Sequence, residues 1–173
     1  NKQLEAQAYN PSILAKLKEI NLAENNKFFL WHTWFSDVFS RDDKEGFDIV
    51  IGNPPYIGEK GHKEIFQPVK ADIHLGQYYL GKMDYFYFFF HLAFNMLSPN
   101  GVTTFITTNY YPTALGARRL RADIKDRMNI RTLFNLGELR LFENAPGQHN
   151  MISSFSKGKD DCKCRVINKK KKG

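Results

Sequence analysis

The chain has no long hydrophobic run that would place it in a membrane. No window of its 173 residues approaches the roughly 18 consecutive apolar residues of a membrane-spanning helix. The N-terminal segment NKQLEAQAYN is too polar for a signal peptide. We therefore expect a cytoplasmic protein with no membrane partner.

Cysteine is also scarce. The sequence has two cysteines, Cys162 and Cys164, and only one residue separates them. This separation is too short for an ordinary structural disulfide, and no second Cys or His pair stands at zinc-finger spacing. The histidines show no pairing at metal-ligand spacing either. The sequence therefore predicts no metal site, and we interpret the two cysteines as ordinary strand residues.

The composition is that of a folded domain with a basic surplus. Hydrophobic residues make up 42% of the chain, and its length fits one domain with a proper core. The net charge of +7 suggests a polyanionic partner. Part of it lies in the terminal run NKKKKG, which is either a solvated tail or a binding element. More informative is the cluster ARRLRADIKDR, residues 117–127, inside the predicted fold.

Helical and strand patterns alternate along the chain and predict an α/β fold with a mostly parallel sheet. Residues 11–20 have the spacing of a short amphipathic helix, whereas the aromatic residues 28–39 are ambiguous. The apolar run FDIVIG, residues 47–52, is typical of a strand that is covered on both faces. The other predicted elements are helices at 84–97 and 114–128, strands at 102–108 and 130–137, and short antiparallel strands at LRLF, MISSFSK and CKCRVIN.

The connection at residues 57–83 is unusually long and contains four glycines. We expect it to be irregular, and loops of this length are usually functional or mobile.

The strand at 47–52 ends on Asn53, Pro54, Pro55 and Tyr56. Ligands of open α/β sheets bind at the carboxyl ends of the strands. Proline cannot donate to a sheet and restricts the residue before it, so the two prolines would fix the Asn53 side chain and the nearby carbonyls. The Asn53 amide oxygen and the Pro54 carbonyl would then face a planar NH2 group that stacks on Tyr56. The simpler alternative is a good turn with a surface tyrosine.

The segment FDIVIGNPPY resembles the catalytic motif of amino-group DNA methyltransferases. The resemblance is strongest to N6-adenine enzymes of type II restriction-modification systems that combine methyltransferase and nuclease in one chain. Three later segments are similar to the same family in the same order: KMDYFYFFFHLAFNMLSPNG, VTTFITTNYYPTALGARRLRADI and LFENAPGQHNMI. The resemblance implies a partial Rossmann-like, class I S-adenosylmethionine-dependent methyltransferase fold, with antiparallel strands at its C-terminus.

The resemblance also implies roles for matching residues. Asn53 and the carbonyl of Pro54 would accept hydrogen bonds from the N6 amino group of an adenine flipped out of double-stranded DNA. Pro55 would complete the catalytic motif. Tyr56 would stack on the base, and Phe142 would pack against its other side or edge. The methyl donor would be S-adenosylmethionine, bound near Asn53, and the transfer would need no metal.

Five charged residues have two interpretations each. Asp84 is either a helix cap or a polar residue that lines the site of the donor's adenine. Asp37 is either a second hydrogen-bond partner of the donor or an ordinary loop aspartate. Arg118, Arg119 and Arg121 are either DNA phosphate contacts or a solvated basic helix face.

The family's glycine-rich turn, which holds most of the donor, is not found before Phe47. We therefore expect residues 1–173 to be one partial catalytic domain. Residues 1–46 would form an N-terminal helix and a connecting segment, and residues 47–173 the catalytic core. The remaining parts of the same polypeptide would supply the donor-binding half and a target-recognition domain, with or without a nuclease. Alone, the chain is expected to be inactive.

Other functions share part of the pattern. Enzymes that methylate a protein glutamine have a similar amino-group clamp, but lack the Asp-led aromatic helix, the later LR helix and the phenylalanine motif. A methyltransferase for amino groups of RNA is a further alternative. A non-catalytic DNA-binding module would keep the clamp for recognition only. The combined features favour adenine in DNA.

Overall fold

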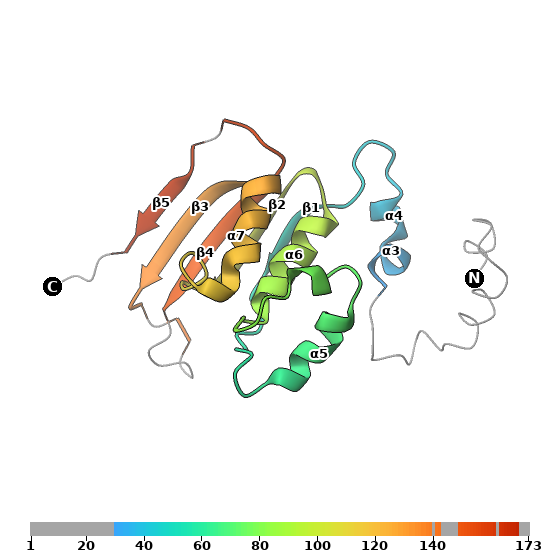
Figure 1. The fold of residues 1–173 in the computed structure, drawn as a ribbon. Helices are drawn as coiled ribbons and strands as arrows, with labels where there is room; N and C mark the ends of the chain where they lie inside the picture. Colours follow the sequence, from blue (N-terminus) through green and yellow to red (C-terminus); the bar gives the residue numbers. More distant parts are fainter. Residues whose placement is uncertain (1–29, 140, 143–148, 162, 170–173) are drawn as a thin grey trace. The chain divides into compact units, whose positions relative to one another are not determined.

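The structure of the protein is a computed structural model, which describes residues 30–139, 141–142, 149–161 and 163–169 (Figure 1). The chain divides into two compact units, residues 1–36 and 37–173. In the first unit, the described residues form helix α3 (Trp31–Trp34), and the ring of Trp31 stacks on that of Phe35, which follows the helix. Helix α4 (Ser36–Phe39) follows. The predicted helix at residues 11–20, Cys162 and most of the lysine run lie outside the described residues.

The second unit is built on a five-stranded sheet in the order β1-β2-β4-β3-β5 (Figure 1). The strands are β1 (Phe47–Gly52), β2 (Leu97–Thr108), β3 (Met128–Gly137), β4 (Asn150–Lys157) and β5 (Arg165–Asn168). β1 is parallel to β2, and β4 runs antiparallel between β2 and β3. The predicted α/β fold is confirmed. The sheet, expected to be mostly parallel with antiparallel C-terminal strands, is mixed, with two parallel and two antiparallel pairs of strands among the described residues.

Some predictions for the C-terminal part were wrong. Leu139, Leu141 and Phe142 do not form the strand expected at LRLF. β5 pairs with β3 in parallel, not antiparallel, orientation. Cys164 is exposed and immediately precedes β5 instead of lying in it. These short segments carry no turn or helix pattern that would reveal the direction in which the chain returns to the sheet.

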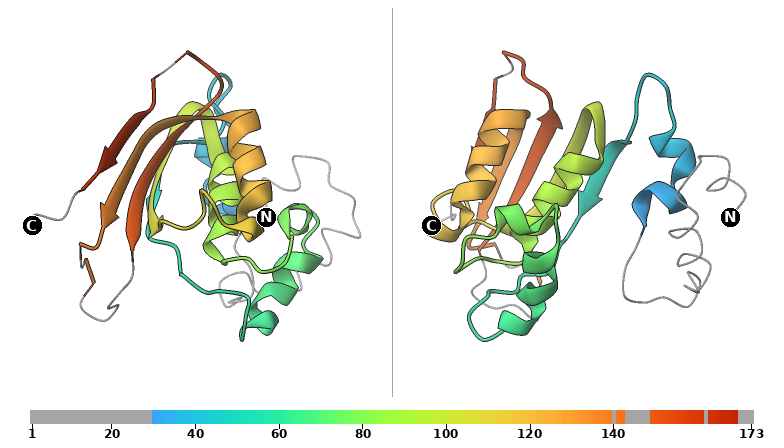
Figure 2. Two further views of the ribbon diagram at one scale, coloured as in Figure 1. Left: turned by 60° about the vertical axis from the view of Figure 1, so that its left-hand side comes forward. Right: turned by 45° about the vertical axis from the view of Figure 1, so that its right-hand side comes forward.

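Helices α6 (Phe86–Met96) and α7 (Arg118–Arg127) lie on one face of the sheet (Figure 2). The α6 sequence is aromatic nearly all round, as expected of a buried helix. The ring of Phe90 lies 5.0 Å from that of Phe105 in β2 and 5.6 Å from that of Phe155 in β4, measured between centroids. These contacts form the centre of the core and fix α6 against the sheet.

Helices α5 (Lys63–Ala71), α6 and α7 of the second unit leave the opposite face of the sheet uncovered (Figure 2, left view). Ile49 and Ile51 of β1 point there and are 69% and 76% exposed. Val50, between them, points to the other face and packs against the core, as the alternation of a strand requires. The prediction that β1 is covered on both faces is therefore wrong for the described residues.

The segment between residues 57 and 83 is more regular than predicted. It contains helix α5 (Lys63–Ala71) and the 3₁₀ turn η1 (Gly76–Tyr78). Phe66 and Val69 are buried on one side of α5. Pro68, inside the helix, is the residue that most disguises this pattern in the sequence, because proline usually breaks helices.

Candidate functional site

The candidate site begins where β1 ends at Gly52. Asn53 follows at once and is exposed. The hydroxyl oxygen of Tyr56 lies 2.6 Å from the Asn53 Oδ1 and 2.9 Å from the Ile106 carbonyl oxygen of β2. A phenol has one hydrogen, so Tyr56 fully donates to only one of these acceptors at a time. Burial raises the pKa of Tyr56 to about 12, so the hydroxyl keeps that hydrogen at neutral pH.

The surroundings of this pair are rigid. The Tyr56 ring is half-buried and meets the Phe86 ring edge-on, at 6.0 Å between centroids and 75° between planes. Pro54 is buried and Pro55 is exposed. No described residue donates a hydrogen bond to the Pro54 carbonyl. The end of β1 therefore presents the exposed Asn53 amide beside an anchored aromatic ring, with a Pro54 carbonyl that accepts no hydrogen bond from the described residues.

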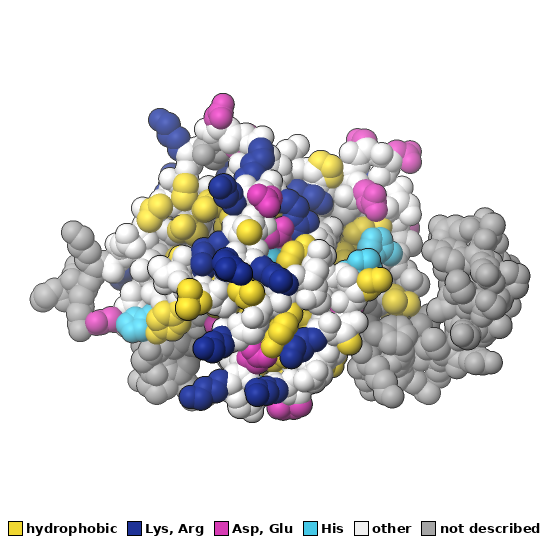
Figure 3. Space-filling model, in the orientation of Figure 1, with side chains coloured by type: hydrophobic (Ala, Val, Ile, Leu, Met, Phe, Trp, Pro, Cys, Tyr) yellow, Lys and Arg dark blue, Asp and Glu magenta, His cyan; other side chains and the backbone are white. Residues whose placement is uncertain are grey.

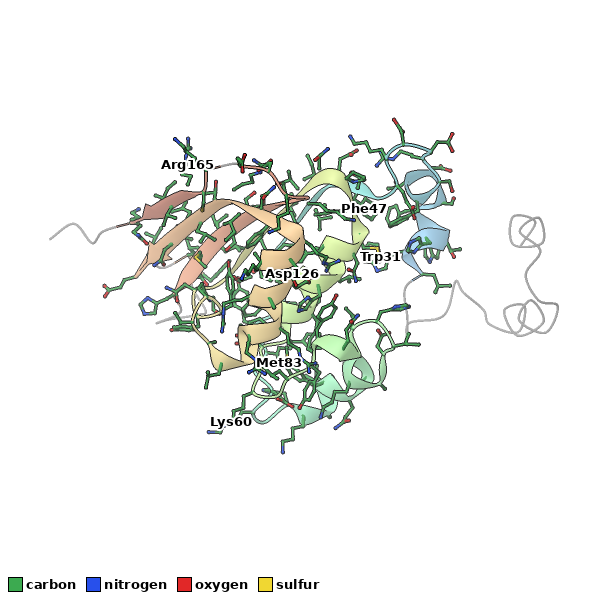
Figure 4. All side chains as sticks on the ribbon, turned by 45° about the horizontal axis from the view of Figure 1, so that its top comes forward. Trp31, Phe47, Lys60, Met83, Asp126 and Arg165 are labelled. Atoms are coloured by element: carbon green, nitrogen blue, oxygen red, sulfur yellow. The ribbon has the colours of Figure 1, made fainter. Side chains whose placement is uncertain are left out.

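A segment that we call the strap, residues 76–84, packs against the residues that follow Tyr56. The Glu59 N–H donates to the Met83 carbonyl at 2.8 Å; Met83 and the neighbouring Lys60 are labelled in Figure 4. The buried Glu59 carboxylate accepts hydrogen bonds from the Tyr79 hydroxyl and, at 2.6 Å, from the Lys82 N–H. The Tyr79 bond, joined by backbone donors, lowers the pKa of Glu59 although burial opposes this. The ionised Glu59 carboxylate thus holds the strap by the hydrogen bonds that it accepts from Tyr79 and Lys82.

The strap brings Asp84 next to the residues after Tyr56. Gly58 and Asp84 form an isolated antiparallel bridge. The Asp84 Oδ2 accepts a hydrogen bond from the Tyr87 hydroxyl at 3.0 Å. The N-cap residue of α6 is Tyr85, and no side chain caps this helix. The helix-cap interpretation of Asp84 is therefore wrong, and a role in donor binding stays a prediction.

The three arginines predicted to contact DNA phosphates have different environments. Arg118 is exposed and makes no side-chain hydrogen bond or ion pair with the described residues. Arg119 donates to two backbone carbonyls of the strap. Arg121 donates to the carbonyls of Tyr111 at 2.9 Å and Ala114 at 2.6 Å, in the loop after β2. Two of the three therefore fix loop backbones, a role that the sequence did not indicate.

Two predicted residues are not joined to this site by any contact among the described residues. Asp37 is exposed in the first turn of α4. Phe142 is half-buried beyond the end of β3. No hydrogen bond, ion pair or ring contact connects either of them to Asn53 or Tyr56 in the described part of the chain. Their roles stay predictions.

Sequence reasoning missed a buried polar cluster that joins the strap to α6 and α7. The His91 ring is fully buried, and its Nδ1 lies 2.5 Å from the Asp123 carboxylate. The ring of Tyr78 stacks on His91, with centroids 3.6 Å apart, and Arg127 donates twice to Asp123. Burial lowers the pKa of His91, which is therefore neutral. Burial would raise the pKa of Asp123, but hydrogen bonds from His91 and Arg127 lower it. The sequence shows that Asp123 and Arg127 are four residues apart on one helix, but it does not show that His91 and Tyr78 lie beside them.

The described residues contain neither a metal-binding group of side chains nor a membrane-spanning helix. Across these residues, His, Cys, Asp and Glu side chains form no group of three or more that could hold a metal ion. None of the helices in this part of the chain is long and apolar enough to cross a membrane.

The mixed α/β sheet carries Asn-Pro-Pro-Tyr directly after β1, at the carboxyl end of that strand. Residues 1–142 match the Eco57I restriction-modification methylase family, and the chain belongs to this family. It is 27% identical over 134 residues to the type II methyltransferase M.HincII of Haemophilus influenzae, covering 77% of this chain and 26% of that protein. The type II methyltransferase M.HindII of H. influenzae strain Rd matches equally, at 27% identity and the same coverage.

One of two similar solved structures supports the fold, because its TM-score exceeds 0.5. The type IIG restriction endonuclease BpuSI is similar with a TM-score of 0.51 at 19% identity, over 70% of this chain and 15% of that one. A class I S-adenosylmethionine-dependent methyltransferase from Listeria monocytogenes is similar with a TM-score of 0.49 at 18% identity, over 71% of this chain and 36% of that one. The chain spans about a quarter, 26%, of the length of the curated relatives that it matches.

Proposed function

We propose that the polypeptide containing this chain transfers a methyl group from S-adenosylmethionine to the N6 of a flipped-out adenine in double-stranded DNA. It would act as the modification enzyme of a restriction-modification system. The observation that carries the proposal is the exposed Asn53 amide beside the anchored Tyr56 ring at the end of β1. Membership of the methylase family supports DNA as the substrate.

Two acceptors match the two hydrogens of the target amino group. The Asn53 Oδ1 and the Pro54 carbonyl would each accept one hydrogen, which increases electron density on the nitrogen and orients its lone pair. When bound, S-adenosylmethionine supplies an electrophilic methyl group on a positively charged sulfur. The N–C bond forms as the S–C bond breaks, and the nitrogen then loses one proton to solvent. Neither a covalent enzyme intermediate nor a metal is needed in this proposal.

Tyr56 would change hydrogen-bond partners when the base arrives. Its hydroxyl has the Ile106 carbonyl as a second acceptor at 2.9 Å, so Asn53 can be released while the hydroxyl remains bonded. The ring would then offer its face to the base. Base flipping costs a few kcal/mol, and stacking on an aromatic ring contributes roughly 1–3 kcal/mol per base, which is enough to offset much of that cost. Phe142 would supply the second contact.

The described residues fit one edge of a donor site. No described residue donates a hydrogen bond to the Asp84 Oδ1, which leaves an acceptor for the amino or hydroxyl groups of S-adenosylmethionine. Asp37 is the second proposed contact. The glycine-rich turn would come from the rest of the polypeptide, so we expect the 173-residue chain alone not to transfer methyl groups.

DNA would lie across the basic surface that contains Arg118. Figure 3 shows Lys and Arg side chains gathered over α7 and around α5 and the strap. Arg118 would pair directly with a phosphate. Arg119 and Arg121 donate to loop carbonyls, but each guanidinium has five N–H donors, so both remain proposed phosphate contacts as well.

The product of the reaction tests the proposal. The full-length polypeptide would be incubated with DNA and isotopically labelled S-adenosylmethionine, and the nucleosides would be separated after digestion. We expect the label in N6-methyladenine. Label in N4-methylcytosine, RNA or a protein glutamine would show that the site serves another amino group. DNA binding without any transfer would indicate a recognition module.

A further inference from the structure

The loop between β2 and α7, residues 109–117, exposes large apolar side chains beside the candidate site. Leu115 is 85% exposed and Tyr110 is 53% exposed. A single exposed leucine is ordinary on a protein surface. Leu115 differs because the backbone that carries it is held in place while its side chain extends into solvent.

Several contacts hold this loop. Arg121 donates to the carbonyls of Tyr111 and Ala114, and the Ala114 N–H donates to the Tyr110 carbonyl at 2.9 Å. Gly116 is buried, and any Cβ at this position would overlap with the backbone carbonyl of Lys82 in the strap. The backbone on both sides of Leu115 is therefore held, so the point from which its side chain extends is set before any partner binds.

Two series of contacts connect this loop to the segment that contains Asn53 and Tyr56. On one side, Gly116 touches Lys82, and the Lys82 N–H donates at 2.6 Å to Glu59, three residues beyond Tyr56. On the other side, the loop continues from β2, whose Ile106 carbonyl accepts from Tyr56. Because β1 and β2 are parallel, Leu115 follows β2 at the same edge of the sheet at which Asn53 and Tyr56 follow β1.

The charges around Leu115 suit a nucleic acid. Lys82 in the strap and Arg118 at the start of α7 are both exposed. Figure 3 shows Lys and Arg side chains gathered over α7. Cationic side chains attract the phosphate backbone, and aliphatic side chains beside them can enter between base pairs and hold the duplex open. An acidic peptide would satisfy the charges but would give no reason for a leucine on a fixed backbone next to Asn53.

We infer that Leu115 enters the duplex beside the target adenine and fills the space that the base leaves when it flips out. This inference rests on the proposed function, because only an enzyme that removes the base from the helix creates that space. A flipped base returns readily if its place stays open to water. An apolar side chain in that place stabilises the extrahelical state, together with stacking on Tyr56.

The test uses the full-length protein and a DNA duplex with 2-aminopurine, a fluorescent adenine analogue, at the target position. The target would first be found by mapping the methylated bases in host DNA. Leu115→Ala should decrease the equilibrium for flipping, read from fluorescence, about tenfold, because most of the leucine's buried apolar surface is lost. An abasic site opposite the target should restore flipping of 2-aminopurine, because no base pair then has to open. In a second duplex with adenine at the target, the same abasic site should restore methylation.

Ile73→Ala is the matched control, since Ile73 is 86% exposed in the segment between α5 and η1. It should flip and methylate like the wild type. The inference is overturned if Leu115→Ala flips the base as well as the wild type does. It is also overturned if Ile73→Ala lowers the flipping equilibrium as much as Leu115→Ala does. If the wild type methylates DNA while Leu115→Ala is unaffected, only this inference fails. If the wild type methylates no adenine, the proposed function fails, and the inference fails with it.

Discussion

The Tyr56 hydroxyl lies 2.6 Å from the Asn53 amide oxygen, so the residue proposed to stack on the target base occupies an acceptor that the base would need. The same hydroxyl lies 2.9 Å from the Ile106 carbonyl. Movement of one hydrogen between these two acceptors frees Asn53 without the loss of a hydrogen bond. In the proposed mechanism, the site would keep this amide bonded to Tyr56 in the absence of DNA and release it when the base enters.

This arrangement predicts different outcomes for two substitutions of Tyr56. Tyr56→Phe keeps the ring and removes the competing hydroxyl, so methyl transfer by the full-length enzyme should stay within a few-fold of the wild type. Tyr56→Ala removes the stacking face, worth roughly 1–3 kcal/mol, and should lower kcat/KM by about 5- to 150-fold. Steady-state assays with a labelled donor would measure both. If Tyr56→Phe lowered kcat/KM as much as Tyr56→Ala, the hydroxyl would be needed to orient Asn53.

The clamp between Glu59 and the strap predicts a loss of stability on truncation. Glu59→Ala leaves the Lys82 N–H and the Tyr79 hydroxyl without this acceptor, and should lower the free energy of unfolding by about 1–3 kcal/mol. Urea denaturation of the chain would measure the change. The control Glu64→Ala alters an exposed carboxylate of α5 and should change stability by less than about 0.5 kcal/mol. If the two variants were equally stable, the clamp would contribute nothing.

Periodicity and turn residues predicted most of the sheet and both helices on its covered face. β1 and α6 were visible because each is a long apolar run with a clear end. α5 was missed because Pro68 and the surrounding glycines resemble a loop, although burial of Phe66 stabilises the helix. The parallel direction of β5 depends on where the chain re-enters the sheet, which no local pattern encodes.

For the candidate site, the sequence indicated residue types but not their contacts. The positions of Asn53 and Tyr56 follow from the end of β1, because the motif itself contains both residues. The bond from Tyr56 to Ile106 depends on the pairing of β1 with β2, which spans 50 positions in the sequence. The contacts of Arg119 with the strap likewise depend on tertiary structure. The sequence therefore could not distinguish an arginine on a solvated helix face from one that holds a loop backbone.

The buried His91 predicts a pH dependence of stability. Burial lowers the pKa of His91 below its ordinary value of 6.5, while the ionised Asp123, Arg127 and the Tyr78 ring face it. The unfolded chain then binds a proton that the folded chain rejects. Stability from this group is therefore complete above pH 6.5 and is lost as the pH falls from there towards the folded pKa.

The expected slope below pH 6.5 is up to about 1.4 kcal/mol per pH unit, measured by urea denaturation at pH values from 7.5 to 5. His91→Phe should remove this component of the slope, whatever its effect on stability at neutral pH. His74→Phe alters an exposed histidine and should leave the slope unchanged. A wild-type slope that persists in His91→Phe would contradict the assignment.

The bare face of β1 predicts a dependence on the rest of the polypeptide. Ile51→Ser should change the stability of the 173-residue chain by less than about 0.5 kcal/mol, since Ile51 is 76% exposed there. In the full-length protein, where we propose that further elements cover this face, the loss should reach about 1.5–3 kcal/mol. Val50→Ser is the control and should destabilise both proteins, because Val50 packs on the core. If Ile51→Ser had the same small effect in the 173-residue chain and in the full-length protein, this face of β1 would be uncovered in both.

The most direct test of the central claim is the nucleoside product of an Asn53→Ala variant of the full-length protein. We expect DNA binding close to that of the wild type and a loss of N6-methyladenine of at least about a hundredfold, since the exposed amide is the proposed acceptor for the reacting nitrogen. Asn95→Ala, at an exposed asparagine of α6 that bonds Arg127, should keep methylation. Undiminished N6-methyladenine from Asn53→Ala would contradict the account.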